Sequence, residues 1–344
     1  MIQIHYNLSE LDKMAADFYK EVEKEFELKN KLEGWEDDEL KPVMEYLAEE
    51  IESIICGRPD KLECHIGKLA LLIDKAKRDY KKNNPHNDKG KNITAANLNT
   101  WVKSEIFKVF NYDTDDNSFT KVDGGRIAYK HAKKLNMNTC PYCNANFTFT
   151  IKSRRLKCRP QFDHFYNKGR YPYLALSFYN LIPSCALCNS GALKGQKQFD
   201  LSKNIHPFLE SIDTIYQFRT KVNAVDFLVN GNNFQLQMIL SDKKNINDPD
   251  VIKATGNIET FALNDRYAFH KDIAEIVIKN SYIYCNSAIY DLYNSLEVNG
   301  KKIFDSEHSI KEQIFGNYLK SSDFHKRIHT KLVRDIAEEF GLII

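Results

Sequence analysis

The chain has 344 residues, of which 42% are hydrophobic and 28% charged, with few glycines and prolines, a composition that excludes a disordered or fibrous protein. Its length exceeds the roughly 150 residues of a typical domain, so one large unit or two to three smaller ones are expected. The formal net charge of +2 excludes a strong overall attraction to polyanions, and any such attraction must come from local clusters of Lys and Arg.

The first 82 residues are expected to be helical. Apolar residues recur at three- and four-residue steps over 9–29, and Ser9 with Asp12 resembles a capping pair at a helix start. Two further helices are predicted from the same spacing, one through Val43, Leu47, Ile51 and Ile54 and one through Ile66, Leu69, Ile73 and Ala76, with Gly57 and Pro59 between them.

Residues 83–98 are polar, contain Pro85 and Gly90 and show no apolar period, which indicates a linker or exposed loop. Further along, the runs VDFLV and FQLQMIL flank an Asn-Gly-Asn-Asn turn at 230–233, which predicts a β-hairpin within 211–245.

Residues 246–344 return to helical spacing, most clearly over 323–340. His325 and His329 lie four apart there, as a zinc pair would, but no HExxH glutamate accompanies them, and a solvated polar face is expected.

The eight cysteines include two Cys-x-x-Cys pairs, Cys140 with Cys143 and Cys185 with Cys188, each called a knuckle below. The chain has no basic start followed by an apolar run of signal-peptide length and no apolar stretch of about 18 residues, so we expect a cytoplasmic protein without a membrane partner. In a reducing compartment such pairs indicate metal ligands, and four thiolates favour a structural Zn²⁺. Four unrelated cysteines or a redox dithiol are the alternatives.

The other four cysteines, Cys56, Cys64, Cys158 and Cys285, are interpreted as ordinary core residues.

A set of polar residues lies between and after the knuckles: Asp163, His164, Asn180-Leu181, Asn189 and Lys194-Gly195. An adjacent carboxylate and imidazole suit phosphodiester hydrolysis, because one group can hold a hard cation while the other takes a proton from water. The carboxylate of Asp163 and the amide oxygen of Asn189 are hard donors that suit Mg²⁺ or Mn²⁺, and His164, neutral near pH 7, would deprotonate the attacking water. The expected products are 5′-phosphate and 3′-hydroxyl ends.

The joint pattern over about 140–206 resembles the HNH, or ββα-metal, nuclease superfamily: Asp-His, then Asn-Leu-x-x-x-Cys-x-x-Cys, then His or Asn, then Lys-Gly. The resemblance implies that Asp163 and Asn189 ligate the catalytic cation, His164 is the general base and Asn180 fixes the loop that orients the site. Asn189 stands where many members have a final His, and members with Asn are also nucleases.

Basic residues crowd the approach to Asp163 and are expected to bind phosphate: Arg154, Arg155, Lys157, Arg159, Lys168, Arg170 and Lys194. A solvated hairpin face is the alternative interpretation. Phosphate contacts give no sequence preference, so DNA is the first expectation for the substrate and RNA stays open. His206 is a further candidate ligand for the cation, with a structural role as the alternative.

Two segments, Tyr171–Leu181 and Phe261–Tyr267, resemble the HNH subunits that accompany SMC-like ATPases in Septu-type and retron-linked anti-phage systems. This resemblance implies a nuclease effector with an ATPase partner, and because the chain has no Gly-x-x-x-x-Gly-Lys-Ser/Thr loop the nucleotide site would belong to that partner. A zinc module that binds nucleic acid without cutting it is the alternative from another functional class.

Together these patterns predict an α+β chain in which mainly helical flanks surround a zinc-stabilised ββα-metal core, followed by a short β-hairpin. The expected divisions are a helical region 1–82, a linker 83–98, a nuclease core 99–210, a hairpin region 211–245 and a helical region 246–344.

Overall fold

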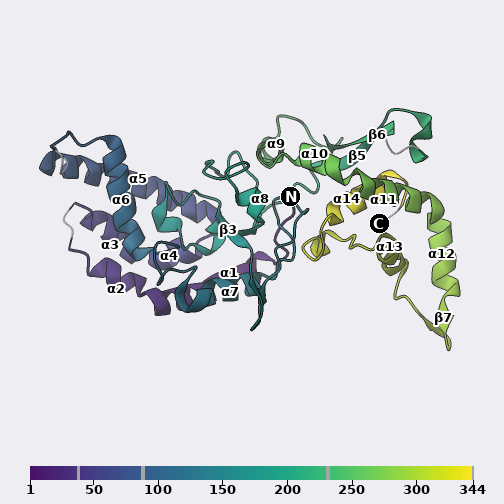
Figure 1. Cartoon of the computed structure of the whole chain (residues 1–344), viewed down its shortest axis with the longest axis horizontal. Helices are drawn as coiled ribbons and strands as arrows, with labels where there is room; N and C mark the ends of the chain where they lie inside the picture. The colour runs from purple at the N-terminus through teal and green to yellow at the C-terminus, as the bar shows by residue number, and fades with distance from the viewer. Residues whose placement is uncertain (37–38, 87–89, 230–232, 343–344) are drawn as a thin grey trace.

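The computed structural model describes the whole chain except residues 37–38, 87–89, 230–232 and 343–344. The molecule is elongated, with the N-terminal helices at one end, the C-terminal helices and several short strands at the other, and the segment that holds the two knuckles between them (Figure 1). Its described residues form helices and small two-stranded antiparallel sheets, so the predicted α+β class is confirmed. None of the helices in the described part of the chain combines the length and apolar character needed to span a membrane.

The N-terminal part consists of helices that pack on one another. They are α1 (Leu8–Phe26), α2 (Leu28–Glu33), α3 (Lys41–Glu49), α4 (Ile51–Cys56), α5 (Pro59–Asn83), α6 (Ala95–Val109) and α7 (Val122–Leu135).

The expected helix over 9–29 is interrupted. Its cap is Asn7, whose side chain accepts from the backbone of Glu10, so the predicted capping by Ser9 is wrong. The helix ends at Glu27, which has a left-handed φ of 49°, and α2 follows at once. The apolar period continues across this break into α2, so the spacing alone did not reveal it.

The predicted boundary at Gly57 and Pro59 is confirmed, because α4 ends before Gly57 and α5 starts at Pro59. The preceding spacing belongs to two helices, α3 and α4, which meet at Glu50. Between α5 and α6 the described residues of 84–94 lie outside any helix, within the segment 83–98 that was predicted as a linker. Both ends of that prediction are wrong, because Asn83 belongs to α5 and residues 95–98 form the first turn of α6.

The central part holds the motif residues. A small sheet pairs β1 (Ile151–Lys152) with β2 (Lys157–Cys158), and a second pairs β3 (Gln161–His164) with β4 (Leu181–Ser184). The segment between β3 and β4 contains the 3₁₀ turns η1 (Pro172–Leu174) and η2 (Phe178–Asn180), and the short helix α8 (Ala186–Asn189) follows β4.

The predicted β-hairpin is present as β5 (Tyr216–Val222) paired with β6 (Phe234–Leu240). The run VDFLV was predicted as the first strand of this hairpin, and that prediction is wrong. Val225–Leu228 forms the 3₁₀ turn η3, and the first strand, β5, lies earlier in the chain. Most of the predicted Asn-Gly turn, 230–232, lies outside the described residues.

The C-terminal part consists of short helices and a small β-ribbon. They are α9 (Pro249–Thr260), α10 (Leu263–Tyr267), η5 (Ala268–His270), α11 (Lys271–Ile283), α12 (Asn286–Ser295), β7 (Glu297–Val298), β8 (Lys301–Lys302), α13 (Glu307–Phe315), η6 (Ser321–Asp323) and α14 (Thr330–Glu339).

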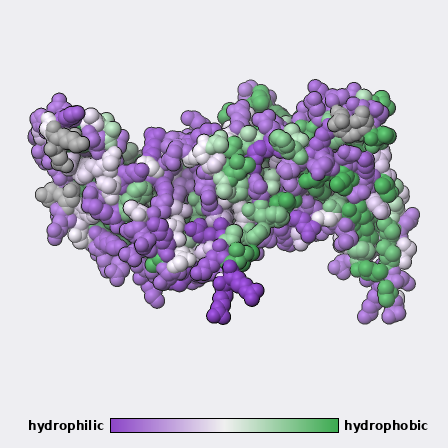
Figure 2. Space-filling model, in the orientation of Figure 1, coloured by the Kyte–Doolittle hydropathy of each residue, from purple (hydrophilic) through white to green (hydrophobic). Residues whose placement is uncertain are grey.

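The expected helix 323–340 is only half realised, because α14 begins after His329, whose φ of 60° is left-handed. Apolar side chains are exposed on α11 and α12, and Figure 2 shows hydrophobic atoms gathered over this end of the molecule, whereas hydrophilic atoms dominate the N-terminal half.

The chain start and the C-terminal part both contact the first knuckle. The Ile2 N–H donates to Pro141 O at 2.9 Å. The buried side chain of Asn144 donates to Phe324 O at 3.1 Å and accepts from Thr330 Oγ1 at 2.9 Å. The backbone carbonyl of Asn144 accepts from His329 N at 2.7 Å. One asparagine in the knuckle turn therefore joins the central part to the C-terminal helices.

Candidate metal centre and active site

The two knuckles meet. The four sulfur atoms of Cys140, Cys143, Cys185 and Cys188 lie within 4.8 Å of one another and all four residues are buried. Four thiolates around one tetrahedral ion with bonds of about 2.3 Å have comparable spacings, so these sulfurs can hold a single metal ion. Among the described residues no other group of three or more His, Cys, Asp or Glu side chains is close enough to share one.

Hydrogen-bond donors surround the sulfurs. The backbone of Cys188 donates to Cys185 Sγ at 3.4 Å, that of Ala145 donates to Cys143 Sγ at 3.4 Å, and the Arg266 guanidinium donates to Cys188 Sγ at 3.3 Å. Hydrogen bonds from the other thiols, helped by the charge of Arg266, hold the pKa of Cys143 well below its usual value. The pKa of Cys185 is also lowered, to about 7, whereas the pKa values of Cys140 and Cys188 are raised well above the usual value, so the surroundings alone favour negative sulfur at two of the four positions.

No sequence pattern assigns a role to Arg266, although it belongs to the segment 261–267 that resembles the HNH subunits of anti-phage systems. In the structure this segment packs on the knuckles: Tyr267 donates to Cys143 O at 2.6 Å, and Phe261 stacks on Tyr142 with ring centres 4.4 Å apart. The segment therefore has a structural role beside the four-cysteine cluster.

The strand pair β3–β4 and helix α8 bring the predicted site residues together. Asp163 pairs with Ile182 and His164 with Leu181 across the ladder. Asn180, which is fully buried, accepts from Tyr166 N at 2.7 Å and donates to Leu174 O at 2.8 Å. Its side chain joins the end of β3 to the connection before β4, which fits its expected role of fixing this loop.

His164 has one ring nitrogen engaged by the backbone. Its Nε2 lies 3.0 Å from Ala175 O, and because a carbonyl can only accept, Nε2 carries the proton and Nδ1 keeps its lone pair. Burial, with the nearby charge of Lys168, lowers the pKa of His164 to about 3. The imidazole is therefore neutral at physiological pH and has a free base nitrogen.

Asp163 is buried and has two protein donors. Tyr142, inside the first knuckle, donates to Oδ2 at 2.6 Å, and the Lys194 ammonium donates to Oδ1 at 3.0 Å. Lys194 also donates to His164 O at 2.7 Å. Each carboxylate oxygen can accept more than one bond, so both still have capacity for a further ligand.

Lys194 does not lie where the sequence predicted it. Its side chain is 1% exposed, so it offers no surface to a phosphate, and it serves as the counter-charge of Asp163 instead. The turn that buries it uses Gly195, whose φ is 46° and where a Cβ would lie 2.8 Å from Gly191 Cα. Only glycine fits there without strain, which gives the Lys-Gly pair a backbone reason.

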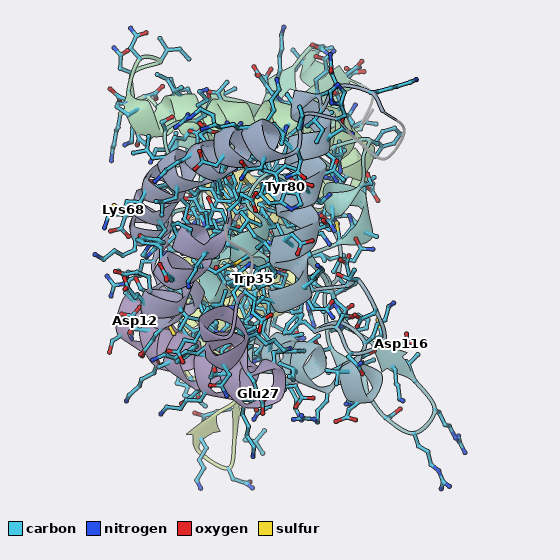
Figure 3. The ribbon with its side chains drawn as sticks, turned by 90° about the vertical axis from the view of Figure 1, so that its left-hand side faces the viewer. Asp12, Glu27, Trp35, Lys68, Tyr80 and Asp116 are labelled. Carbon is cyan, nitrogen blue, oxygen red and sulfur yellow. The ribbon has the colours of Figure 1, made fainter. Side chains whose placement is uncertain are left out.

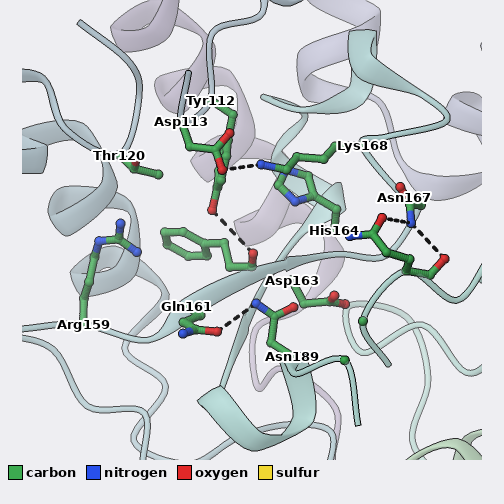
Figure 4. A pocket seen from close by; sticks show the side chains of 14 residues that line it. Tyr112, Asp113, Thr120, Arg159, Gln161, Asp163, His164, Asn167, Lys168 and Asn189 are labelled. Atoms are coloured by element: carbon green, nitrogen blue, oxygen red, sulfur yellow. Dashed lines mark hydrogen bonds and ion pairs between the residues drawn. The ribbon is translucent and has the colours of Figure 1, made fainter. Parts of the chain in front are cut away.

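Asn189 ends α8 beside Asp163. Its Nδ2 donates to Gln161 Oε1 at 2.9 Å, and this bond turns the amide oxygen toward Asp163 (Figure 4). Gln161 was not assigned a role from the sequence, yet it lies two residues before Asp163 on β3 and so projects from the same face of the strand. That alternation was the available signal for it.

A cavity of about 490 Å³ opens over these residues, with Asp163, His164 and Asn189 in its wall. Its opposite wall comes from outside the motif region: Tyr112 stacks edge-on against His164 at 4.5 Å, and Asp113 binds the Lys168 ammonium at 2.5 Å (Figure 4). The segment between α6 and α7 carries no pattern that would have placed it here.

The remaining basic residues of the predicted patch fall into two groups. Arg159 and Lys168 line the cavity. Arg154, Arg155 and Lys157 lie exposed on the β1–β2 hairpin and its turn, and Arg170 is exposed just beyond the cavity. Of the seven predicted cations, two therefore lie in the cavity wall, and the exposed side chains of the β1–β2 hairpin are not among its lining residues.

The expectation of a core position is wrong for Cys64, Cys158 and Cys285, which are exposed.

The three histidines considered from the sequence outside the Asp-His pair, His206, His325 and His329, are all buried. His206 packs on Phe165 with ring centres 4.2 Å apart and is absent from the cavity wall, so the structure places it in the core and not beside Asp163. The expectation of a solvated face for His325 and His329 is wrong: His325 stacks on His5 at 3.5 Å, and His329 faces His270 at 4.2 Å. The left-handed backbone at His329 takes the pair off a common helix face.

Comparisons of the chain with protein-family models, with curated proteins and with solved structures gave no significant match.

Proposed function

We propose that this chain is a metal-dependent nuclease of the HNH kind that hydrolyses phosphodiester bonds, with DNA as its first substrate. The observation that carries the proposal is the meeting of a neutral imidazole, a carboxylate and an oriented amide oxygen in one cavity, which Arg159 and Lys168 also line. His164 is fixed by Ala175 with Nδ1 free, while Asp163 and Asn189 present oxygen donors beside it. These are the groups that water activation and phosphate hydrolysis require.

The chemistry follows from these positions. His164 Nδ1 takes the proton of a water molecule, the water oxygen attacks phosphorus, and the bond to the 3′ oxygen breaks. The departing 3′ oxygen takes a proton from solvent, and His164 returns its proton to solvent. The products are a 5′-phosphate and a 3′-hydroxyl. Arg159 and Lys168, in the cavity wall, hold the phosphate against this attack.

The donors fit a hard divalent cation such as Mg²⁺ or Mn²⁺. Asp163 offers the second lone pairs of its two oxygens, and the Gln161 bond leaves Asn189 Oδ1 free on the same side. Bound there, the cation would neutralise charge that develops on the phosphate and on the departing oxygen. The four cysteines, as soft donors that leave no open position, would hold a structural Zn²⁺.

The test is cleavage by the purified full chain. Plasmid DNA and total RNA are incubated separately with Mg²⁺ or Mn²⁺, and His164→Ala is the matched variant. The proposal expects nicked or linear DNA with 5′-phosphate ends, and a loss of at least about 100-fold in His164→Ala, which is the usual contribution of a general base. Cutting of RNA alone would change the substrate, and equal activity in His164→Ala would remove the nuclease assignment.

A role in anti-phage defence with an ATPase partner is a further part of the proposal, supported by the resemblance of 171–181 and 261–267. The packing of 261–267 on the knuckles explains that segment without a partner, so the partnership needs its own test. Co-expression with the product of a neighbouring gene, followed by size-exclusion chromatography with light scattering, gives one: a monomer that cuts at full rate alone would eliminate it.

A further inference from the structure

A groove lies on the N-terminal helices beside the proposed active site. It encloses about 470 Å³ between α5, α6 and the 3₁₀ turn η1, and its floor is apolar, with Ile73, Val102 and Pro172 among the residues that form it. Near the end of α5, Tyr80 (labelled in Figure 3) stacks on Trp101 of α6 with ring centres 3.9 Å apart and so joins the two helices. We call this the α5–α6 groove.

The rim of the groove is cationic. Lys77, Lys103 and Arg170 line it together with one acid, Asp74, which lies 3.9 Å from the Lys77 ammonium. Within the part of the chain that the structure describes, Lys103 and Arg170 form no ion pair, although both are exposed. Arg170 lies over the ring of Tyr171, another residue of the groove, at 5.4 Å. Two cations are therefore left without a counter-charge above an apolar and aromatic surface.

The groove continues from the proposed active site. A Cβ at Gly169 would lie 3.9 Å from Lys103 Nζ and 3.6 Å from Gln196 Oε1, so these two side-chain tips are close neighbours. Gln196 lines the His164 cavity and Lys103 lines the α5–α6 groove. The short segment 167–171 separates the two, and a chain that leaves one can enter the other.

We propose that the α5–α6 groove binds a single strand of nucleic acid next to the phosphate that is cut. Lys103 and Arg170 contact phosphates, and unpaired bases lie on Tyr171 and the apolar floor, the combination by which single strands are bound without sequence preference. This inference rests on the proposed function and extends it, because it gives α5 and α6 a role in holding substrate. An acidic peptide would satisfy the cations, but it would have no use for continuity with the His164 cavity.

Binding of a fluorescent single-stranded DNA of about 20 nucleotides tests this proposal, measured against salt concentration in buffer without added divalent cation. The affinity should fall with salt, and the slope of log K against log salt should shrink by about 0.7 for each phosphate contact removed, so by about 1.4 in Lys103→Gln/Arg170→Gln. The matched control is Lys20→Gln/Lys133→Gln. Both control lysines are exposed and line a separate cavity between α1 and α7 that also holds Asp17 and Glu21.

The possible outcomes distinguish a failure of the groove proposal from a failure of the nuclease proposal. A reduced slope in the groove variant with an unchanged slope in the control supports the groove. Equal slopes in wild type and both variants overturn the groove while the nuclease proposal stands. Equal loss in both double variants reveals a general charge effect and also overturns it. If the groove variant loses binding of poly-glutamate but not of DNA, the occupant is an acidic peptide. If the wild-type chain binds no nucleic acid, the proposed function fails and this inference fails with it.

Discussion

Replacing Lys194 with methionine should destabilise the fold strongly. The change keeps an unbranched side chain of similar length and removes the ammonium that lies 3.0 Å from Asp163 Oδ1, in a pair whose side chains are 1% and 2% exposed. Breaking a buried ion pair at one partner costs about 3–5 kcal/mol, because the other charge remains in a poorly solvated site. Tyr142 still donates to Oδ2, so we expect a loss near the lower end, about 3 kcal/mol.

The measurement is equilibrium unfolding in urea, followed by circular dichroism and by fluorescence. Lys197→Met is the control, since this lysine is exposed three residues away and should change the free energy of unfolding by no more than about 0.5 kcal/mol. The double variant Asp163→Asn/Lys194→Met removes both charges. It should be more stable than the sum of the two single changes predicts, by about 1–3 kcal/mol.

A loss below about 1 kcal/mol in Lys194→Met, or strict additivity in the double variant, would refute the reasoning. The same variant also reports on the proposed cation. Without the ammonium, the negative charge of Asp163 has no neighbouring positive charge, so a divalent ion should bind it more tightly. Added Mg²⁺ should therefore stabilise Lys194→Met more than the wild-type chain.

Three further outcomes are expected. Cys185→Ser should lower bound zinc, measured by elemental analysis, well below one ion per chain and should expose the chain to proteolysis, because thiolate binding energy is folding energy. Asn144→Ala should reduce the free energy of unfolding by about 2–3 kcal/mol, measured in urea, since buried partners in the C-terminal part lose their bonds, while zinc content stays unchanged. Burial lowers the pKa of His131, His164 and His206 to about 3 in the folded chain, so the unfolded chain takes up these protons first. The free energy of unfolding, measured in urea titrations, should therefore be highest above about pH 6.5 and fall toward pH 3, by up to about 4 kcal/mol per pH unit near pH 5. The cleavage rate should show no titration near pH 6.5 before unfolding begins.

The sequence predicted the parts of the site that short spacings define. A two-residue gap between cysteines lets two sulfurs bind one ion in many different folds. Because each knuckle supplies only two of the four ligands of a tetrahedral ion, the sequence predicted that the two knuckles would meet, and they do. The adjacency of Asp163 and His164 on a strand was equally local. These predictions could be made from the sequence because they depend on residues close together in the chain and not on tertiary packing.

What the sequence missed depends on how distant segments pack. Lys194 was expected on the surface with the neighbouring basic residues. The Lys-Gly pair alone does not indicate that the turn directs this side chain into the interior, where it pairs with Asp163 of β3. The left-handed residues Glu27 and His329 divide helices whose apolar period runs on without interruption, and periodicity cannot register a change in one φ angle. Tyr112 and Asp113 reach the cavity only through the packing of α6 and α7.

The four-cysteine cluster and the proposed active site are connected through Asp163. Tyr142 is held in place by its two knuckle cysteines and by Phe261, and its hydroxyl fixes one oxygen of Asp163, while Lys194, which follows the second knuckle, fixes the other. Each knuckle therefore positions one donor to the same carboxylate. An ion bound by the four sulfurs would fix the separation of the knuckles and with it the distance between these two donors. On the proposed function, the four cysteines would therefore also help to position Asp163 relative to His164 and Asn189.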